Sequence, residues 1–322
     1  MKAILANDGI DPEGKDILEK NGYCVYEQKM PPEEISTFIN EKQVDVLIVR
    51  SATQVRRELI EACSNLKIIA RAGVGTDNID LEAAKAKNIK VLNTPGASSQ
   101  SVAELVFAHM FTLARRLQLS NRFMPEKGHS DFNALKKRFS DGIELRGRTL
   151  GILGFGRIGQ TVASLALGMG MRIIPYDPIV KKATVELDII HIPENTIKIE
   201  FESQSLDELL GQSDFITLHV PKQPGGRAIL GAAEFQKMKK GAYIINTSRG
   251  GLVDELALLE FLNSGYIGGA GLDVFENEPS PLPDLLKHPL VSVTPHIGGS
   301  TRDAQVRIGI ELAQRIIEVY PH

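Results

Sequence analysis

The chain has 322 residues, of which 43% are apolar and 24% are charged, the proportions of an ordinary water-soluble globular protein. At roughly 150 residues per domain, this length predicts two domains. The 37 Lys and Arg residues nearly balance the 40 Asp and Glu residues, and the net charge is −3. This balance argues against a dedicated nucleic-acid binder, which normally carries a basic excess.

Cysteine content and the lack of long apolar runs indicate the cellular compartment. Cys24 and Cys63 are the only cysteines and form no CxxC pair, so neither a disulfide framework nor a cysteine-rich metal site is expected. The apolar run at the N-terminus is too short for a signal peptide. No run approaches the roughly 18 apolar residues of a membrane span. We therefore expect a cytoplasmic protein with no membrane partner.

Short β-branched runs alternate with helical patterns through the first part of the chain, as in parallel βαβ units. The predicted strands are residues 3–6, 23–26, 44–49, 68–70 and 91–92, and the predicted helices are about 12–20, 32–41, 55–63 and 80–87. Together they predict a small doubly wound α/β domain.

The alternation stops at residue 99. Residues 99–122 form one long amphipathic segment whose apolar side chains recur at helical spacing. The polar stretch from about 122 to 148 then predicts a surface arm. The arm either stays in solvent or embraces a second subunit.

A second alternating series begins at Thr149 and predicts a larger parallel sheet. Its predicted strands are residues 150–153, 172–176, 215–219, 243–246, 270–274 and 291–293. Within an insert at 183–203, residues 189–192 and 197–201 predict a hairpin that turns near Glu194 and Asn195. An amphipathic helix over 302–320 can pack against either half of the molecule.

A glycine-rich turn, GFGRIG, lies between the first strand and the first helix of this second series, which is the context that a dinucleotide-binding motif requires. Gly154 permits the tight turn, Gly156 lets a pyrophosphate approach the backbone, and Gly159 lets helix and strand pack closely. The phosphates then lie at the helix N-terminus, beside Arg157 and Ile158, where free N–H groups favour anions.

An acidic residue stands at the distance that this motif expects. Asp177 ends the next predicted strand, 18 residues after Gly159. Its carboxylate can accept hydrogen bonds from the adenosine ribose and repels a 2′-phosphate, so we expect NAD rather than NADP. Lys181 and Lys182 follow it and keep NADP as the alternative. A tight turn with a surface aspartate is the structural alternative.

Three reactive side chains follow the later predicted strands. Arg249, Glu278 and His296 follow the fourth, fifth and sixth strands of the second series. Because the carboxyl ends of parallel strands lie at one edge of a sheet, we expect them near a bound dinucleotide. Taken singly, the arginine can be a surface ion pair and the histidine a helix cap. His219 and His288 are expected to be structural.

Four blocks in this order resemble the D-2-hydroxyacid dehydrogenase family over essentially the full length of the chain. They are GFGRIG at 154–159, INTSRGGLVDE at 245–255, GAGLDVFENEP at 269–279 and VTPHIGGST at 293–301.

The resemblance implies an α/β fold with two doubly wound domains. A flavodoxin-like substrate domain would comprise residues 1–98 and 297–322, and a Rossmann NAD-binding domain, residues 99–296, would be inserted within it. The active site would lie in the cleft between them. The region near 99–148 would be a dimerisation arm, so a homodimer is implied.

The implied reaction is an NAD-linked hydride transfer between a small anionic 2-hydroxy acid and its 2-keto acid, with no metal. His296 would exchange the proton, because imidazole titrates near neutral pH. Glu278 would hold its second ring nitrogen, and Arg249 would bind the substrate carboxylate. Besides the glycine turn, the implied NAD contacts are Val74, Asp177, Val220, Pro221, Thr247, Arg249, Asp273 (at the carboxamide), His296 and Gly298.

Two blocks in the first half resemble those of the phosphoglycerate dehydrogenases within this family. The glycine turn at 73–75 would offer backbone N–H groups to the substrate carboxylate, and Arg50 and Arg71 would bind a phosphomonoester. Ion pairs between loops are the alternative. The implied substrate contacts are Arg50, Ser51, Arg71, Val74, Gly75, Ser98, Arg249 and His296. At Ser98 the family usually has asparagine.

The leading hypothesis is therefore NAD-dependent oxidation of D-3-phosphoglycerate to 3-phosphooxypyruvate, the first step of serine synthesis, by a short form without a C-terminal regulatory domain. Another D-2-hydroxyacid dehydrogenase, such as a hydroxypyruvate or glyoxylate reductase, is the alternative. A non-catalytic NAD-binding corepressor is more distant, because all three reactive residues are present.

Overall fold

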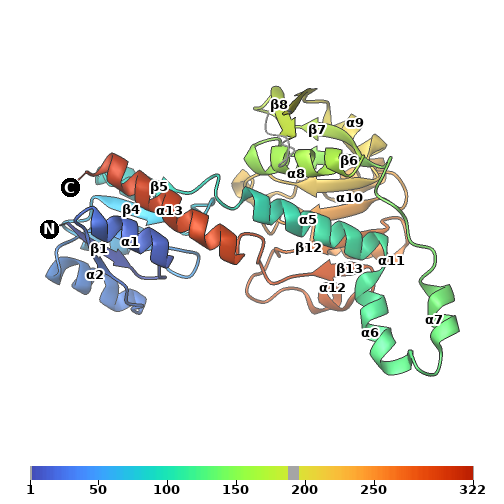
Figure 1. Ribbon diagram of the computed structural model, residues 1–322, viewed down its shortest axis with the longest axis horizontal. Helices are drawn as coiled ribbons and strands as arrows, with labels where there is room; N and C mark the ends of the chain where they lie inside the picture. The colour runs from blue at the N-terminus through green and yellow to red at the C-terminus, as the bar shows by residue number, and fades with distance from the viewer. Residues whose placement is uncertain (1, 188–195, 322) are drawn as a thin grey trace. The chain divides into compact units, whose positions relative to one another are not determined.

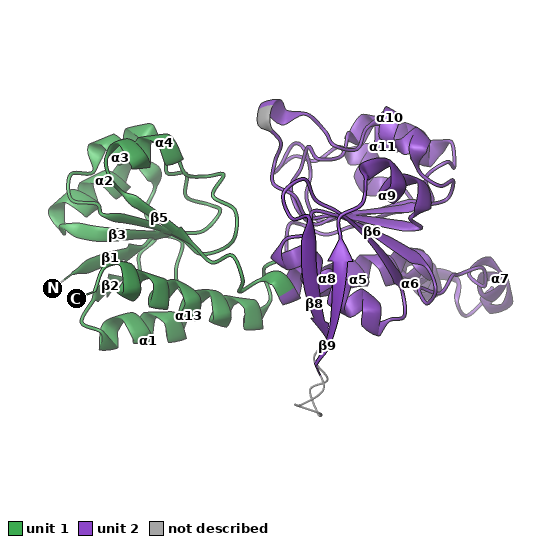
Figure 2. Cartoon of the chain, turned by 90° about the horizontal axis from the view of Figure 1, so that it is seen from above, with its two compact units in different colours: residues 1–99, 299–322 green, residues 100–298 purple. Residues whose placement is uncertain are grey.

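The computed structural model describes residues 2–187 and 196–321 and divides into two compact units (Figure 1). Unit 1 comprises Met1–Ser99 and Gly299–His322, and unit 2 comprises Gln100–Gly298 (Figure 2). Unit 2 is thus inserted between the two segments of chain that build unit 1. No helix among the described residues is both long and apolar enough to cross a membrane.

Unit 1 contains a five-stranded parallel sheet in the order β2-β1-β3-β4-β5, the order of flavodoxin-like folds. Its elements are β1 (Ala3–Ala6), α1 (Pro12–Lys20), β2 (Cys24–Tyr26), α2 (Pro32–Glu41), β3 (Val44–Val49), α3 (Arg57–Ala62), β4 (Ile68–Arg71), α4 (Leu81–Ala86), β5 (Lys90–Asn93) and α13 (Arg302–Val319).

Helices cover both faces of this sheet, which explains why its strands are almost entirely apolar (Figure 2). Alternate residues serve the two faces: Leu5 packs in the core under α2, α3 and α4, whereas Ile4 packs in the core under α1 and α13. The terminal helix α13 runs beside α1, and a Cβ on Gly14 would lie only 2.5 Å from the carbonyl oxygen of Gly309. The last helix therefore belongs to unit 1.

Unit 2 contains a six-stranded parallel sheet in the order β13-β12-β11-β10-β6-β7. Its elements are α5 (Ser99–Ala114), α6 (Leu117–Lys127), α7 (Phe132–Arg138), β6 (Thr149–Leu153), α8 (Arg157–Gly168), β7 (Arg172–Tyr176), β8 (Lys182–Leu187), β9 (Ile197–Glu202), α9 (Leu206–Gln212), β10 (Phe215–Leu218), the 3-10 turn η1 (Pro224–Gly226), α10 (Ala232–Lys237), β11 (Tyr243–Asn246), α11 (Glu255–Asn263), β12 (Gly269–Leu272), α12 (Pro283–Lys287) and β13 (Val291–Val293).

The strand order of unit 2 reverses between β6 and β10, which makes this point the topological switch of the sheet. One core lies between the sheet and helices α5 and α8, and a second lies between the sheet and helices α9 to α12. Ligands of open α/β sheets bind at the carboxyl ends of the strands beside such a switch. The glycine turn after β6 lies there.

The long helix predicted over 99–122 is broken in the structure. Helix α5 ends at Ala114, because Arg116 adopts a left-handed conformation with φ of 51°, and α6 begins at Leu117. The polar stretch that follows is partly helical, with α6 reaching Lys127 and α7 beyond it. Apolar spacing could not reveal this break, because the pattern continues through it.

The insert after β7 forms a different hairpin from the predicted one. Strand β8 pairs with β9 in antiparallel register, with Val185 opposite Ile199. Val185 is buried and, with Phe201 from the facing strand, packs in the core shared with α8. The predicted strand at 189–192 and the turn near Glu194 and Asn195 lie outside the described residues. The sequence pattern did not predict β8 (Lys182–Leu187), which is the first strand of the observed hairpin.

Candidate active site

The glycine turn joins β6 to α8 with the backbone that its residues suggest. Gly154 has φ of 97°, and a Cβ there would lie 2.5 Å from the carbonyl oxygen of His219, so only glycine fits. Gly156 is the N-cap of α8, and nothing lies within 4 Å of where its Cβ would be. Arg157 and Ile158 begin the helix. The open backbone and the free N–H groups of this helix fit the pyrophosphate of a dinucleotide.

Gly159→Ala is expected to destabilise unit 2 by about 2 kcal/mol, as overpacking does, and to weaken NADH binding. A Cβ at Gly159 would lie 2.2 Å from the carbonyl oxygen of Gly154, so the turn must move. Gly168→Ala is the matched control at the end of the same helix, because nothing lies within 4 Å of its Cβ position. Thermal unfolding and NADH titration measure both effects. Equal behaviour of the two variants would contradict the close packing.

Asp177 connects the turn after β7 to the glycine turn. Its Oδ2 accepts a hydrogen bond of 2.7 Å from the N–H of Phe155, and its Oδ1 accepts bonds from the N–H groups of Ile179 and Val180. A carboxylate has about four acceptor positions, so capacity for a further hydroxyl donor remains. The acid therefore shapes the phosphate turn as well as offering a position for a ribose.

Polar atoms at the ends of β10 and β11 also fit a bound cofactor. Among the described residues, Nδ1 of His219 and Oγ1 of Thr247 are buried and have no hydrogen-bond partner. Burial lowers the pKa of His219 to about 3, so this ring is neutral. The Oγ of Ser248 donates a 2.6 Å bond to the carbonyl of Val220, just before Pro221, and so joins the two strand ends. With the open turn at Gly156, these residues fit NAD.

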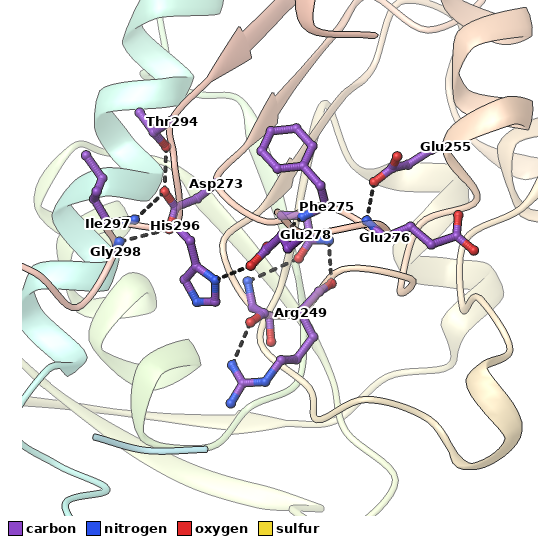
Figure 3. Close-up of polar contacts among 12 residues, drawn as sticks. Arg249, Glu255, Asp273, Phe275, Glu276, Glu278, Thr294, His296, Ile297 and Gly298 are labelled. Atoms are coloured by element: carbon purple, nitrogen blue, oxygen red, sulfur yellow. Dashed lines mark hydrogen bonds and ion pairs between the residues drawn. The ribbon is translucent and has the colours of Figure 1, made fainter. Parts of the chain in front are cut away.

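His296 and Glu278 form a hydrogen-bonded couple (Figure 3). Nδ1 of the imidazole lies 2.8 Å from Oε2 of the carboxylate, whose other oxygen accepts a 2.9 Å bond from the N–H of Phe275. The carboxylate is thus held between its own turn and the ring. Half of the imidazole side chain is exposed, so Nε2 is the ring atom available to a substrate.

Asp273 holds the turn that carries His296, which has φ of 54° (Figure 3). The backbone carbonyl of Asp273 accepts the N–H of His296 at 2.8 Å, and its fully buried carboxylate accepts the N–H groups of Ile297 and Gly298 at 2.8 Å each. Thr294 donates a 2.6 Å bond to the same carboxylate. These bonds hold a non-glycine residue in a conformation that is costly on its own. The predicted contact to the nicotinamide carboxamide stays a prediction.

His109 supports this turn, a role that was not predicted from the sequence. It is 2% exposed, with Nε2 3.1 Å from the hydroxyl of Thr294 and Nδ1 2.9 Å from that of Ser292. Because Thr294 donates to Asp273, its oxygen must accept from Nε2–H of His109. Burial lowers the pKa of His109, against the smaller opposing effect of Asp273, and so favours the neutral ring. The available signal was a histidine on the apolar face of α5, in register with Val102 and Leu113.

Arg249 lies on the loop after β11, which packs directly against the turn that carries Glu278. Asn246 shapes this loop: its Nδ2 donates to the carbonyl of Arg249 at 2.9 Å, and its Oδ1 accepts from the N–H of Ser248 at 3.1 Å. A Cβ on Gly250 would lie 1.8 Å from the carbonyl oxygen of Phe275. Unit 2 therefore brings Arg249, Glu278 and His296 to one edge of its sheet.

The predicted substrate contacts Arg50 and Ser51 lie in unit 1, where they line a cavity of about 450 Å³ at the carboxyl ends of β1 and β3. Their loop is held from two sides. Asp8 accepts the N–H groups of Arg50 and Thr53 at 2.7 and 3.0 Å, and Asn78 donates to the carbonyls of the same two residues at 2.8 and 2.7 Å. The structure therefore fixes the backbone from which Arg50 projects.

Arg71 is the last residue of β4, and Val74 and Gly75 lie on the loop that follows it in the same unit. Gly73 has φ of 144°, and the space of its missing Cβ is taken by the guanidinium of Arg71. The carbonyl of Val74 accepts a 2.7 Å bond from Asn93. Ser98 is buried and follows Ala97, which packs against Ala304 and Ile308 of α13. All the substrate contacts predicted in the first half thus lie in unit 1, and the reactive triad lies in unit 2.

Comparison with known proteins identifies the family. Residues 107–298, more than half of the chain, match the model of the D-isomer specific 2-hydroxyacid dehydrogenase NAD-binding domain. The chain belongs to the D-2-hydroxyacid dehydrogenase family. It is an NAD-dependent dehydrogenase of 2-hydroxy acids, and unit 2 contains its NAD-binding domain.

Similar members of this family carry different substrate names. The dehydrogenase is 46% identical to the hydroxypyruvate reductase of Thermotoga maritima, over 98% of this chain and 97% of that protein. It is 44% identical to the D-3-phosphoglycerate dehydrogenase of Methanocaldococcus jannaschii, over 99% of this chain but 57% of that protein. An NAD complex of formate dehydrogenase from Staphylococcus aureus aligns with a TM-score of 0.77 and 29% identity, over 100% of this chain and 96% of that chain.

Proposed function

We propose that this dehydrogenase oxidises D-3-phosphoglycerate to 3-phosphooxypyruvate, the first step of serine synthesis. The supporting observation is the charge of the cavity at Arg50. Its lining includes the cations Arg50 and Lys29 and the acids Asp8 and Glu27. The carboxylate of Asp8 is turned to backbone N–H groups and Glu27 pairs with Lys15 at 3.2 Å, so both acids are engaged on the wall, and Arg50 and Lys29 are the cations that an anion would meet. A phosphomonoester suits this cavity.

In the proposed reaction, bound NAD supplies the hydride acceptor. Nε2 of His296 removes the proton of the 2-hydroxyl during oxidation and returns it to the carbonyl oxygen during reduction. Glu278 holds Nδ1 and so fixes the tautomer and stabilises the imidazolium that forms. Arg249 binds the substrate carboxylate through its planar guanidinium, which orients the 2-carbon. Asp273 keeps the His296 turn in place.

Reduction of hydroxypyruvate or glyoxylate is the second candidate. It is favoured by the similarity to a hydroxypyruvate reductase that this chain covers almost entirely, whereas the chain spans about 57% of the similar phosphoglycerate dehydrogenases. The same roles for Arg249, Glu278 and His296 would serve this reaction. Only the contacts to the remote end of the substrate would differ.

A paired kinetic experiment separates the two candidates. We expect NADH formation with 3-phosphoglycerate, and we expect Arg50→Gln to raise KM for this substrate about tenfold with little effect on KM for hydroxypyruvate, since one charged contact is lost. Arg56→Gln is the control, because this exposed arginine lies on the same loop but bonds to Gln54 and to the carbonyl of Asp77. Turnover of unphosphorylated acids alone would assign the protein to the reductases.

We further propose a homodimer formed through helices α5 to α7. Large apolar side chains are exposed along these helices, with exposures of 39% for Phe111, 50% for Leu117, 40% for Met124 and 57% for Phe132. Large exposed apolar side chains that recur along consecutive helices are typical of surfaces that bind another protein.

A further inference from the structure

Glu255 is a buried acid beside the turn that carries Glu278, the partner of His296 (Figure 3). It is the first residue of α11 and is 5% exposed. Its Oε1 accepts a short hydrogen bond of 2.6 Å from the backbone N–H of Glu276 (Figure 3). Burial of a carboxylate is costly unless the carboxylate is hydrogen-bonded. The donor to Glu255 is a backbone N–H group two residues before Glu278.

The bond that Glu255 accepts extends a chain of contacts that ends on the imidazole. Glu276 and Glu278 belong to the same turn after β12, and the N–H of Phe275 in this turn binds Oε1 of Glu278 at 2.9 Å. Oε2 of Glu278 then lies 2.8 Å from Nδ1 of His296. Glu255 therefore fixes, from a neighbouring helix, the backbone that orients the proton partner of the histidine.

Glu255 also adds negative charge beside this couple. Burial raises its pKa, and the charges of Glu276 and Glu278 raise it further, whereas the bond from the N–H of Glu276 acts against them. Interactions between charges are mutual, so an ionised Glu255 favours the protonated imidazole. Among the residues drawn in Figure 3, the charged groups near the couple also include Arg249, on the loop after β11, and Asp273, just after β12.

We propose that Glu255 is a positioning residue for the proton transfer: it holds the Glu278 turn in place and stabilises the protonated form of His296. The proposal rests on the proposed role of the couple in catalysis. It adds a carboxylate that touches neither substrate nor cofactor but acts on the histidine through the Glu278 turn.

Two variants separate the hydrogen bond from the charge. Glu255→Gln keeps a side-chain oxygen for the N–H of Glu276 and removes the charge, whereas Glu255→Ala removes both. The imidazole titration of His296 is followed by NMR in the full chain, with its signal assigned by loss in His296→Gln. We expect its midpoint to fall by about half a pH unit in the glutamine variant and further in the alanine variant. Glu260→Gln, exposed on the same helix, is the matched control.

The pH profile of keto-acid reduction should follow the same order, because this direction needs the protonated ring. Its acidic range should therefore shift to lower pH, with KM for NADH unchanged. A His296 titration that is the same as wild type in both variants overturns the proposal, and a shift in the alanine variant alone assigns the effect to the hydrogen bond. The NMR midpoint does not depend on turnover. Near-wild-type turnover of His296→Gln would therefore separately remove the couple from the proposed mechanism.

Discussion

His296→Gln is expected to lower turnover about a thousandfold, within the range of general acid–base catalysis, while NADH binding is retained. Glutamine can keep a hydrogen bond to Glu278, but it cannot exchange a proton near neutral pH. The turn itself is held by Asp273 through three backbone N–H groups, so this substitution leaves its main supports in place. The loss should therefore appear in kcat rather than in cofactor affinity.

Stopped-flow and steady-state rates in both directions, with NADH affinity from fluorescence titration, test this expectation. His129→Gln is the control, because His129 is exposed in the arm and remote in sequence from the reactive residues. Near-wild-type turnover of His296→Gln would remove this histidine from the mechanism. Loss of NADH binding to the same degree as activity would instead make its role structural.

Arg249→Lys is expected to lower kcat/KM for the hydroxy acid about a hundredfold, chiefly through KM. Lysine keeps the positive charge but loses the planar pair of donors that binds a carboxylate on two oxygens. The half-buried loop around Arg249 is shaped through its backbone by Asn246, so the substitution spares this support. The guanidinium of Arg249 also donates a 2.7 Å hydrogen bond to the carbonyl of Ser248. The ammonium group of lysine can donate the same bond.

The measurement is substrate saturation at fixed NAD, with Arg227→Lys as the control at an exposed position outside the reactive loops. A short monocarboxylic acid that inhibits competitively supplies a second readout, since its affinity should fall in parallel with that of the substrate. If only the affinity for NADH falls, Arg249 serves the cofactor and another group binds the carboxylate.

Most of the architecture could be predicted because it depends on local pattern. Buried parallel strands are short apolar runs, and the helices between them are amphipathic, so both sheets are readable in chain order. The glycine turn was predictable for a similar reason, since a φ of 97° at Gly154 and the contact at Gly159 admit no side chain. The family followed from four such blocks in one order.

The two features that were not predicted, the break in the helix over 99–122 and the first strand of the observed hairpin, depended on contacts that the local sequence pattern does not encode. The apolar spacing of α5 continues past Ala114, and only the left-handed backbone of Arg116 divides the helix. The alternation at Lys182–Leu187 becomes a strand because Ile197–Glu202 pairs with it, and the burial of Val185 in the core shared with α8 fixes which face turns inward.

By itself the sequence determined the family and the two parallel α/β sheets and singled out Arg249, Glu278 and His296 as the candidate reactive groups, because residue type and order carry that information. Only the tertiary structure decided what holds those groups. Asp273 supports the His296 turn, His109 supports Thr294, and Glu255 supports the Glu278 turn. These partners are 20 or more residues apart in the chain, so their hydrogen bonds exist only once the strand ends are assembled at one edge of the sheet.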